Sequence, residues 1–102
     1  MTAQEQENKA IARLKAYKSN QRLVELLDDE ARRKQAAAEI AAVDHALATL
    51  TPPEFEIIWR SYIDNDRHAA AKLSLAMNYT DTHVRRLRRG VVRKVALAMF
   101  GA

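Results

Sequence analysis

Basic side chains are concentrated in a short stretch near the C-terminal end of the chain, and their type suits the binding of a polyanion. The planar guanidinium group of arginine can hold a phosphate, and it can also donate two hydrogen bonds to the O6/N7 edge of guanine. Four arginines between positions 85 and 89 therefore have the chemistry of nucleic-acid recognition. The basic side chains of the stretch are Arg85, Arg86, Arg88, Arg89, Arg93 and Lys94.

The charge is distributed unevenly along the 102 residues. Residues 66–102 contain eight basic and two acidic side chains, a net charge of +6, whereas residues 1–65 contain nine basic and eleven acidic side chains, a net charge of −2. A basic end on a nearly neutral body favours a polyanionic partner at that end. A solvated basic helix would give the same asymmetry, so charge alone leaves both interpretations open.

The basic stretch has the period of an amphipathic helix over residues 81–100. At about 100° per residue, one apolar stripe is formed by Val84, Leu87, Val91, Val95 and Ala98. The opposite side carries Thr82, Arg85, Arg86, Arg89 and Arg93. Arg88 and Lys94 flank the stripe, and Gly90 interrupts the helix at a cost of about 1 kcal/mol. We therefore expect a helix with one buried side and one cationic side.

The composition predicts that an all-α fold holds these side chains. Helix-favouring residues are abundant, whereas the chain has only two glycines and two prolines. The clearest boundary is at Thr51 and Pro52, because proline disfavours helix in the residue before it and is favoured at the first position of the next helix. Thr51 and Glu54 also have the spacing of a capping box. We expect a helical extension over residues 1–50 and a helix-turn-helix unit over residues 51–102.

The pattern of the extension predicts a long N-terminal helix or a helical hairpin. A first helix is expected over residues 2–18, and a second over residues 20–50, which would be about 45 Å long. A turn at Ser19 and Asn20 is one interpretation, and an uninterrupted helix is the other. The second helix would pack against the first helix or against a second protomer, or it would be solvated with a single buried stripe.

Two further helices are predicted before the basic one, over residues 52–63 and 67–76. In the first, Phe55, Ile58, Trp59 and Tyr62 have the spacing of a core-facing side. The second should bury Ala70, Leu73 and Met77. A tight turn should follow, in which Asn78 adopts the left-handed conformation and Thr80 caps the basic helix.

Two segments of the chain carry a resemblance to a known family. The first is Leu47–Tyr62 (LATLTPPEFEIIWRSY) and the second is Leu73–Arg89 (LSLAMNYTDTHVRRLRR). From Val43 to Phe100, the chain resembles the region-4-like helix-turn-helix of sigma factors, and most of all the small phage transcriptional regulators of the ArpU/RinA type. It departs from the family pattern at the turn glycine, which is Asn78, and at a usual alanine, which is Ser74.

The resemblance implies roles for a set of polar and basic residues in the basic helix and at its N-cap. The residues that it places at base edges are Thr82, His83, Arg85, Arg86 and Arg89. The residues that it places at phosphates are Thr80, Arg88, Arg93 and Lys94. His83 is equally well interpreted as a residue at the flank of the helix. Trp59 and Tyr62 could stack on bases, but their helical spacing favours core packing.

The resemblance also implies a function and partners. We expect a sequence-specific regulator of transcription, of phage late genes, that inserts the helix over residues 81–100 into the major groove of double-stranded DNA. A homodimer through the N-terminal helices would read two half-sites. The alternative is a sigma-like module that binds RNA polymerase or another acidic protein. The expected location is the cytoplasm of the bacterial host, in association with the nucleoid.

Other classes of function find little support in the sequence. The chain has no cysteine, and His45, His68 and His83 lack metal-ligand spacing, so no metal or other cofactor is expected. The paired acids lie in polar runs, and no nucleophile–base pair or phosphate loop is visible, which argues against an enzyme. The N-terminal residues do not have the pattern of a signal peptide, and no apolar run reaches the length of a membrane span.

Overall fold

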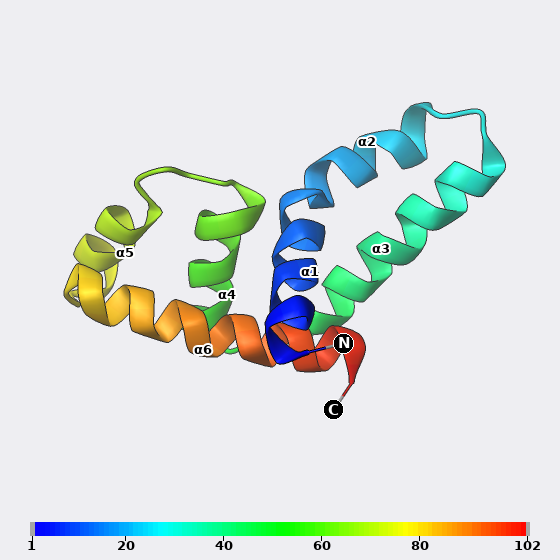
Figure 1. Ribbon diagram of the computed structural model, residues 1–102. Helices are drawn as coiled ribbons and strands as arrows, with labels where there is room; N and C mark the ends of the chain where they lie inside the picture. The colour runs from blue at the N-terminus through cyan, green and yellow to red at the C-terminus, as the bar shows by residue number, and fades with distance from the viewer. Residues whose placement is uncertain (1, 102) are drawn as a thin grey trace.

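Seven helical segments follow one another in the computed structural model, which describes residues 2–101 (Figure 1). No strand occurs within that range, so the predicted all-α class is confirmed. The segments are α1 (Ala3–Lys15), α2 (Tyr17–Leu26), α3 (Glu30–Ala48), α4 (Pro52–Ile58), the π-helical turn η1 (Trp59–Ile63), α5 (Ala69–Met77) and α6 (Asp81–Phe100).

The predicted helix over residues 20–50 is wrong, because the chain turns back on itself in the middle of that range. Leu27 has an extended backbone (φ −85°, ψ 135°), which ends α2. The carboxylate of Asp29 accepts hydrogen bonds from the amides of Ala31 and Arg32, at 3.0 and 3.2 Å, and so caps the start of α3. α2 and α3 therefore form the hairpin that projects from the rest of the molecule (Figure 1).

Polar contacts between side chains fix this hairpin. The hydroxyl of Tyr17 donates to Asp44 Oδ1 at 2.5 Å, and the amide of Asn20 donates to Glu39 Oε2 at 2.9 Å. Tyr17 and Asn20 are both buried, so these bonds satisfy polar groups that have lost contact with water. The break between α1 and α2 lies at Ala16, and the helix continues through residues 19 and 20.

The start of α4 follows the predicted capping box. The hydroxyl of Thr51 accepts from the amide of Glu54 at 3.4 Å, and the carboxylate of Glu54 accepts from the amide of Thr51 at 2.8 Å. The end of the predicted helix differs from an α-helix, because η1 continues α4 with π-type bonding. The amide of Asp64 donates to the carbonyl of Trp59, five residues back, at 2.8 Å.

The side of this helix that was predicted to face the core is only partly buried. Ile58 is fully buried, but Phe55 is 37% exposed and stacks on the ring of Trp59, with centroids 5.5 Å apart. Ile57 and Ile63 are buried instead. The physical reason is that α4 and η1 have packing partners on two sides, whereas the prediction assumed one buried stripe on a uniform α-helix.

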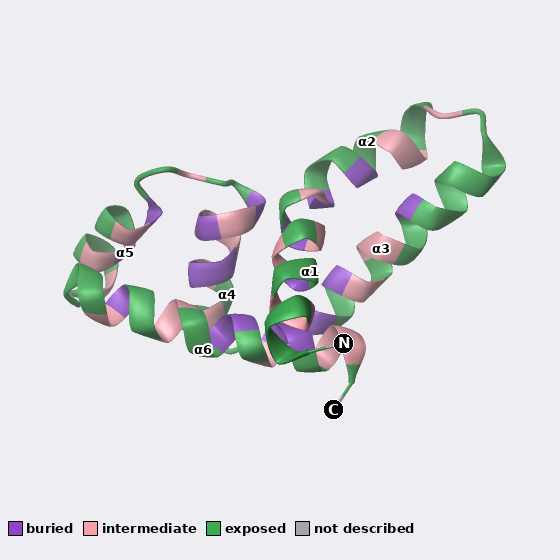
Figure 2. Ribbon diagram, in the orientation of Figure 1, coloured by how far each residue is buried: buried purple, intermediate pink, exposed green. Residues whose placement is uncertain are grey.

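Two hydrophobic clusters form the core, and α6 contributes to both. The smaller one is made by Ile57, Ala69, Leu73 and Val84, which belong to α4, α5 and the first turn of α6. The larger one joins α1, α2, α3, α4 and η1 to the second half of α6. Figure 2 shows the buried residues on the sides where these helices face one another. Residues 2–50 and 51–101 thus share the larger core.

Candidate nucleic-acid interface

The turn between α5 and α6 has the predicted conformation. Asn78 adopts the left-handed conformation (φ 58°, ψ 40°), and its amide donates to the carbonyl of Ser74. The Ser74 hydroxyl also donates to the carbonyl of Tyr79. Thr80 then caps α6, because its hydroxyl accepts from the amide of His83 at 3.1 Å. These local bonds fix the direction in which α6 leaves the turn.

α6 runs without interruption from Asp81 to Phe100, so Gly90 does not break it. A Cβ atom on Gly90 would have no neighbour within 4 Å, so packing does not require glycine there. Of the predicted stripe, Val84, Val91 and Val95 are buried, and Leu87 and Ala98 are half-buried. Val92 and Ala96 are also buried. These two were not predicted, because they lie against a helix from the other end of the chain.

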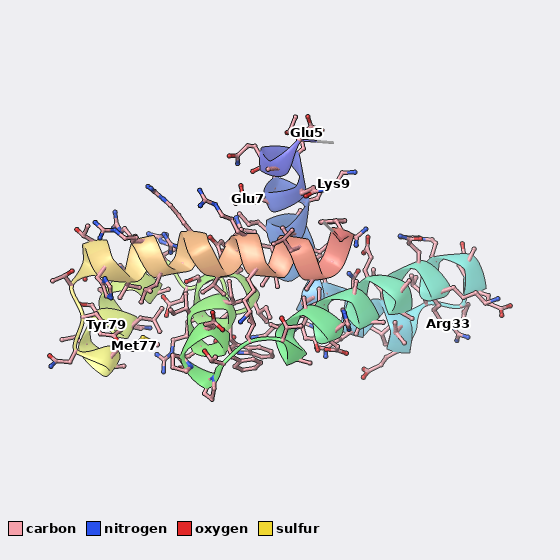
Figure 3. All side chains as sticks on the ribbon, turned by 90° about the horizontal axis from the view of Figure 1, so that it is seen from below. Glu5, Glu7, Lys9, Arg33, Met77 and Tyr79 are labelled. Carbon is pink, nitrogen blue, oxygen red and sulfur yellow. The ribbon has the colours of Figure 1, made fainter. Side chains whose placement is uncertain are left out.

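All three predicted base-contacting arginines lie on the exposed side of the first half of α6. Arg85, Arg86 and Arg89 are exposed, and none has a carboxylate within ion-pair distance in the described part of the chain. Thr82 is exposed on the same half of the helix. In Figure 3, side chains with nitrogen atoms at their tips extend from this half into solvent. The first half of α6 therefore presents cationic groups that are free to bind an anion.

An aromatic pair lies at the start of α6. The ring of His83 packs against the ring of Tyr79, with centroids 4.7 Å apart and an interplanar angle of 82°. His83 is half-buried by this contact, whereas Tyr79 is 45% exposed. Tyr79 was not predicted as a site residue. Its position in the turn immediately before the basic helix was the signal that could have identified it.

Of the predicted phosphate-contacting residues, Thr80 is exposed. The other three contact side chains of other helices. Lys94 Nζ lies 2.9 Å from Glu54 Oε1, and Arg93 Nε lies 3.3 Å from Glu7 Oε1. The guanidinium carbon of Arg88 lies over the ring of Tyr62, 6.0 Å from its centroid. The second half of α6 therefore directs both of its basic side chains toward glutamates of other helices.

The pair between Glu54 and Lys94 is reflected in a pKa. The pKa of Glu54 is lowered from its ordinary value, first by the hydrogen bond from the backbone amide of Thr51 and then by the one from Lys94. The carboxylate thus caps α4 and also forms an ion pair with Lys94 of α6. Lys94 therefore pairs with a residue of the fold instead of extending freely into solvent.

Trp59 and Tyr62 pack inside the molecule. Trp59 lies between Phe55 and Tyr17, whose ring meets it edge-on with centroids 6.1 Å apart. Tyr62 is half-buried against the larger core, and burial raises its pKa, an effect that the charge of Arg88 partly offsets. These contacts agree with the core interpretation rather than with stacking on bases.

The remaining titratable groups form no second site in the part of the chain that the structure describes. His45 and His68 are exposed, and no three His, Cys, Asp or Glu side chains within residues 2–101 are grouped so that they could hold a metal ion. Asp66 caps the turn before α5 by accepting from the amide of His68 at 2.9 Å, and it pairs with Lys72 at 2.7 Å. Within the same residues, every helix is too short or too polar to cross a membrane.

Compared with models of known protein families, with curated proteins and with solved structures, the chain matches none of them. The resemblance to phage regulators therefore stays a prediction.

Proposed function

We propose that this protein binds double-stranded DNA by inserting the first half of α6 into the major groove. The observation that carries the proposal is the set of three exposed arginines, Arg85, Arg86 and Arg89, which have no acidic partner among residues 2–101. They project from a helix whose other side is buried in both hydrophobic clusters. A rigid helix that presents guanidinium groups can read base edges in a groove about 12 Å wide.

The residues of the first half divide into two roles in this proposal. Arg85, Arg86 and Arg89 donate to base edges, and the hydroxyl of Thr82 adds a shorter polar contact. Thr80 holds a phosphate where the chain enters α6, since the hydroxyl that accepts from His83 can still donate. His83 supports the start of the helix through its contact with Tyr79.

The biological role that we propose is regulation of transcription in a bacterial host, as in the phage regulators that the sequence resembles. We further propose that two copies associate through the hairpin of α2 and α3 and read two half-sites. The hairpin leaves Leu26 at its tip 77% exposed, and Ala38 and Ala41 of α3 are also exposed. Analytical ultracentrifugation should then detect a dimer, and substitution of Leu26 by a charged residue should weaken it.

The experiment that tests DNA binding begins with selection of bound duplexes from a random pool. The recovered sequence is then measured against a shuffled one by fluorescence anisotropy at about 50 to 200 mM salt, where phosphate contacts give a steep decline in affinity. We expect the selected duplex to bind more tightly, and both to weaken as salt rises. Binding that depends on neither salt nor sequence contradicts the proposal.

A second candidate function is supported by an apolar groove beside Arg86. The groove holds about 350 Å³ and is lined by Ile57, Met77, Tyr79 and Leu87 among others. An acidic, partly apolar segment of a protein such as RNA polymerase would fit this surface, with its carboxylates at Arg86. Retention of polymerase by the immobilised protein, without binding to any duplex, would favour this function over DNA recognition.

A further inference from the structure

α1 lies across α6 where the exposed arginines end. Ala10 and Leu14 of α1 belong to the larger core together with Val92 of α6, so the two helices pack directly against each other. Arg89 and Arg93 line the same small pocket as Gln4 and Glu7 of α1. Figure 3 shows that the N-terminal turns of α1 project past α6 on the side to which the cationic side chains extend.

This crossing limits how far α6 can enter a duplex. The major groove is about 12 Å wide and a helix with its side chains is about 10–12 Å across, so the groove admits α6 but not a second helix beside it. Insertion is therefore restricted to the part from Asp81 to Arg89, which is about 12 Å long. In that position, α1 lies next to the rim of the groove, where the phosphates are.

The acidic residue at this rim is Glu7. Its side chain is 18% exposed, and its Oε1 lies 3.3 Å from Nε of Arg93, whose own side chain is 74% exposed. Arginine pairs with carboxylates and phosphates through the same donors, so the carboxylate occupies a position that a phosphate oxygen would otherwise take. Without this contact, Arg85, Arg89 and Arg93 would form one continuous cationic row, because they are spaced four residues apart on one side of α6.

We propose that Glu7 is a positioning residue that keeps Arg93 out of the DNA interface and so lowers by one the number of phosphates that the protein can contact. This inference rests on the proposed DNA-binding function. Phosphate contacts stabilise complexes with all sequences alike. With fewer phosphate contacts, the protein binds random DNA less tightly. The preference between sequences then depends on the first half of α6.

Glu7 is a better residue for the test than Glu54, the partner of Lys94. Glu54 also closes the capping box of α4, so its substitution would disturb the fold as well as release a cation. Glu7 has no such second role among the described residues, and Glu5 offers a matched control. Glu5 lies two residues earlier on α1 and is exposed, but it does not line the pocket with Arg89 and Arg93.

The experiment compares wild-type protein, Glu7→Gln and Glu5→Gln on a duplex of random sequence over about 50 to 200 mM salt. We expect Glu7→Gln to bind about five- to tenfold more tightly at 0.1 M salt, with a slope of log K against log salt that is steeper by about 0.9, the effect of one added phosphate contact. Glu5→Gln should resemble the wild type. Equal slopes for wild type and Glu7→Gln, or an equal gain from Glu5→Gln, overturn the inference.

Arg93 supplies an independent test that does not depend on the folding of the Glu7 variant. We expect Arg93→Ala to keep the wild-type slope, since Arg93 is already withheld from phosphates, and the double variant Glu7→Gln/Arg93→Ala to lose the gain of Glu7→Gln. A slope for Arg93→Ala that is shallower by about 0.9 shows that Arg93 contacts DNA in the native protein, which overturns the inference. If the wild type binds no duplex at any salt concentration, the proposed function fails and this inference with it.

Discussion

The two halves of α6 differ in what surrounds their basic side chains. In the first half, Arg85, Arg86 and Arg89 reach solvent without an acidic partner in the described chain. The buried residue of this half, Val84, belongs to the smaller cluster with residues of α4 and α5. In the second half, Arg93 and Lys94 contact glutamates of α1 and α4, and the helix is buried by the N-terminal helices. Neighbouring helices, and not residue type, therefore decide which cations remain free to bind an anion.

The largest expected effect is a loss of stability when the core that buries the second half of α6 is disturbed. Leu14→Ala removes a fully buried side chain of α1 from the larger core, so we expect it to lower the free energy of unfolding by about 2–5 kcal/mol. Chemical denaturation followed by circular dichroism measures this loss. The control is Leu75→Ala, at a side chain of α5 that is 86% exposed, which should change stability by about 0.5 kcal/mol or less.

The next effect concerns DNA and the first half alone. Arg86→Ala should weaken binding to the selected duplex by about 1–3 kcal/mol, or roughly 5- to 150-fold, and should relax the preference at one base pair, because a base-edge contact is lost. Arg33→Ala makes the same change in charge on the exposed surface of α3, far from α6 in Figure 3, and should leave affinity nearly unchanged. Similar losses for both variants would mean that only net charge matters.

A smaller effect tests the packing that covers the second half. The hydrogen bond to Asp44, together with burial, raises the pKa of Tyr17 to about 12 from an ordinary 10.0. Tyr17 is therefore protonated more readily in the folded protein, so its contribution is complete below about pH 10 and is lost as the pH rises toward 12. We expect Tyr17→Phe to cost about 1 kcal/mol near neutral pH and to lose less stability than the wild type between about pH 10 and pH 12.

The smallest effects are expected from the substitution of Lys94, a basic residue in the second half of α6. Lys94→Ala should lower stability by only about 0–1 kcal/mol, since the pair with Glu54 is partly exposed. Its effect on DNA affinity should be much smaller than that of Arg86→Ala, because Lys94 is already paired with Glu54. A loss of affinity as large as that of Arg86→Ala would show that Lys94 leaves Glu54 to bind phosphate.

The same pair has a consequence at acid pH. The folded-state pKa of Glu54 lies below its ordinary 4.5, so the carboxylate stabilises the fold above that pH and the stabilisation is lost as the pH falls further. Denaturation measured across that range should show a smaller loss for Lys94→Ala than for the wild type. The loss should not vanish, because the amide of Thr51 contributes more than Lys94 to the lowered pKa.

What the sequence predicts correctly here is local. The capping box of Thr51 and Glu54, the left-handed Asn78 and the cap at Thr80 each depend on residues within a few positions, so the starts of α4 and α6 could be predicted closely. The turn between α2 and α3 was equally local but lacks a proline or glycine. Asp29 there has the pattern of one more charged residue on a helix surface, and its role as an N-cap was missed.

What the sequence could not predict depends on contacts between distant parts of the chain. The burial of Val92 and Ala96 follows from the docking of α1, and the pairs of Glu7 with Arg93 and Glu54 with Lys94 join residues that lie far apart in sequence. A helical wheel of residues 81–100 therefore gives the right exposed side for the first half of α6. For the second half, the helical wheel does not include the residues of α1 and α4 that contact the same side.

The π-helical turn η1 has a consequence for changes in chain length. A π-type bond spans one residue more than an α-type bond, so residues 59–63 hold a surplus residue without loss of the helix. Deletion of one residue within this turn can be absorbed by conversion to α-type bonding. The same deletion in α6 before Arg89 would turn the following side chains by about 100°. The chain can thus be shortened by one residue here while the arginines of α6 keep their directions.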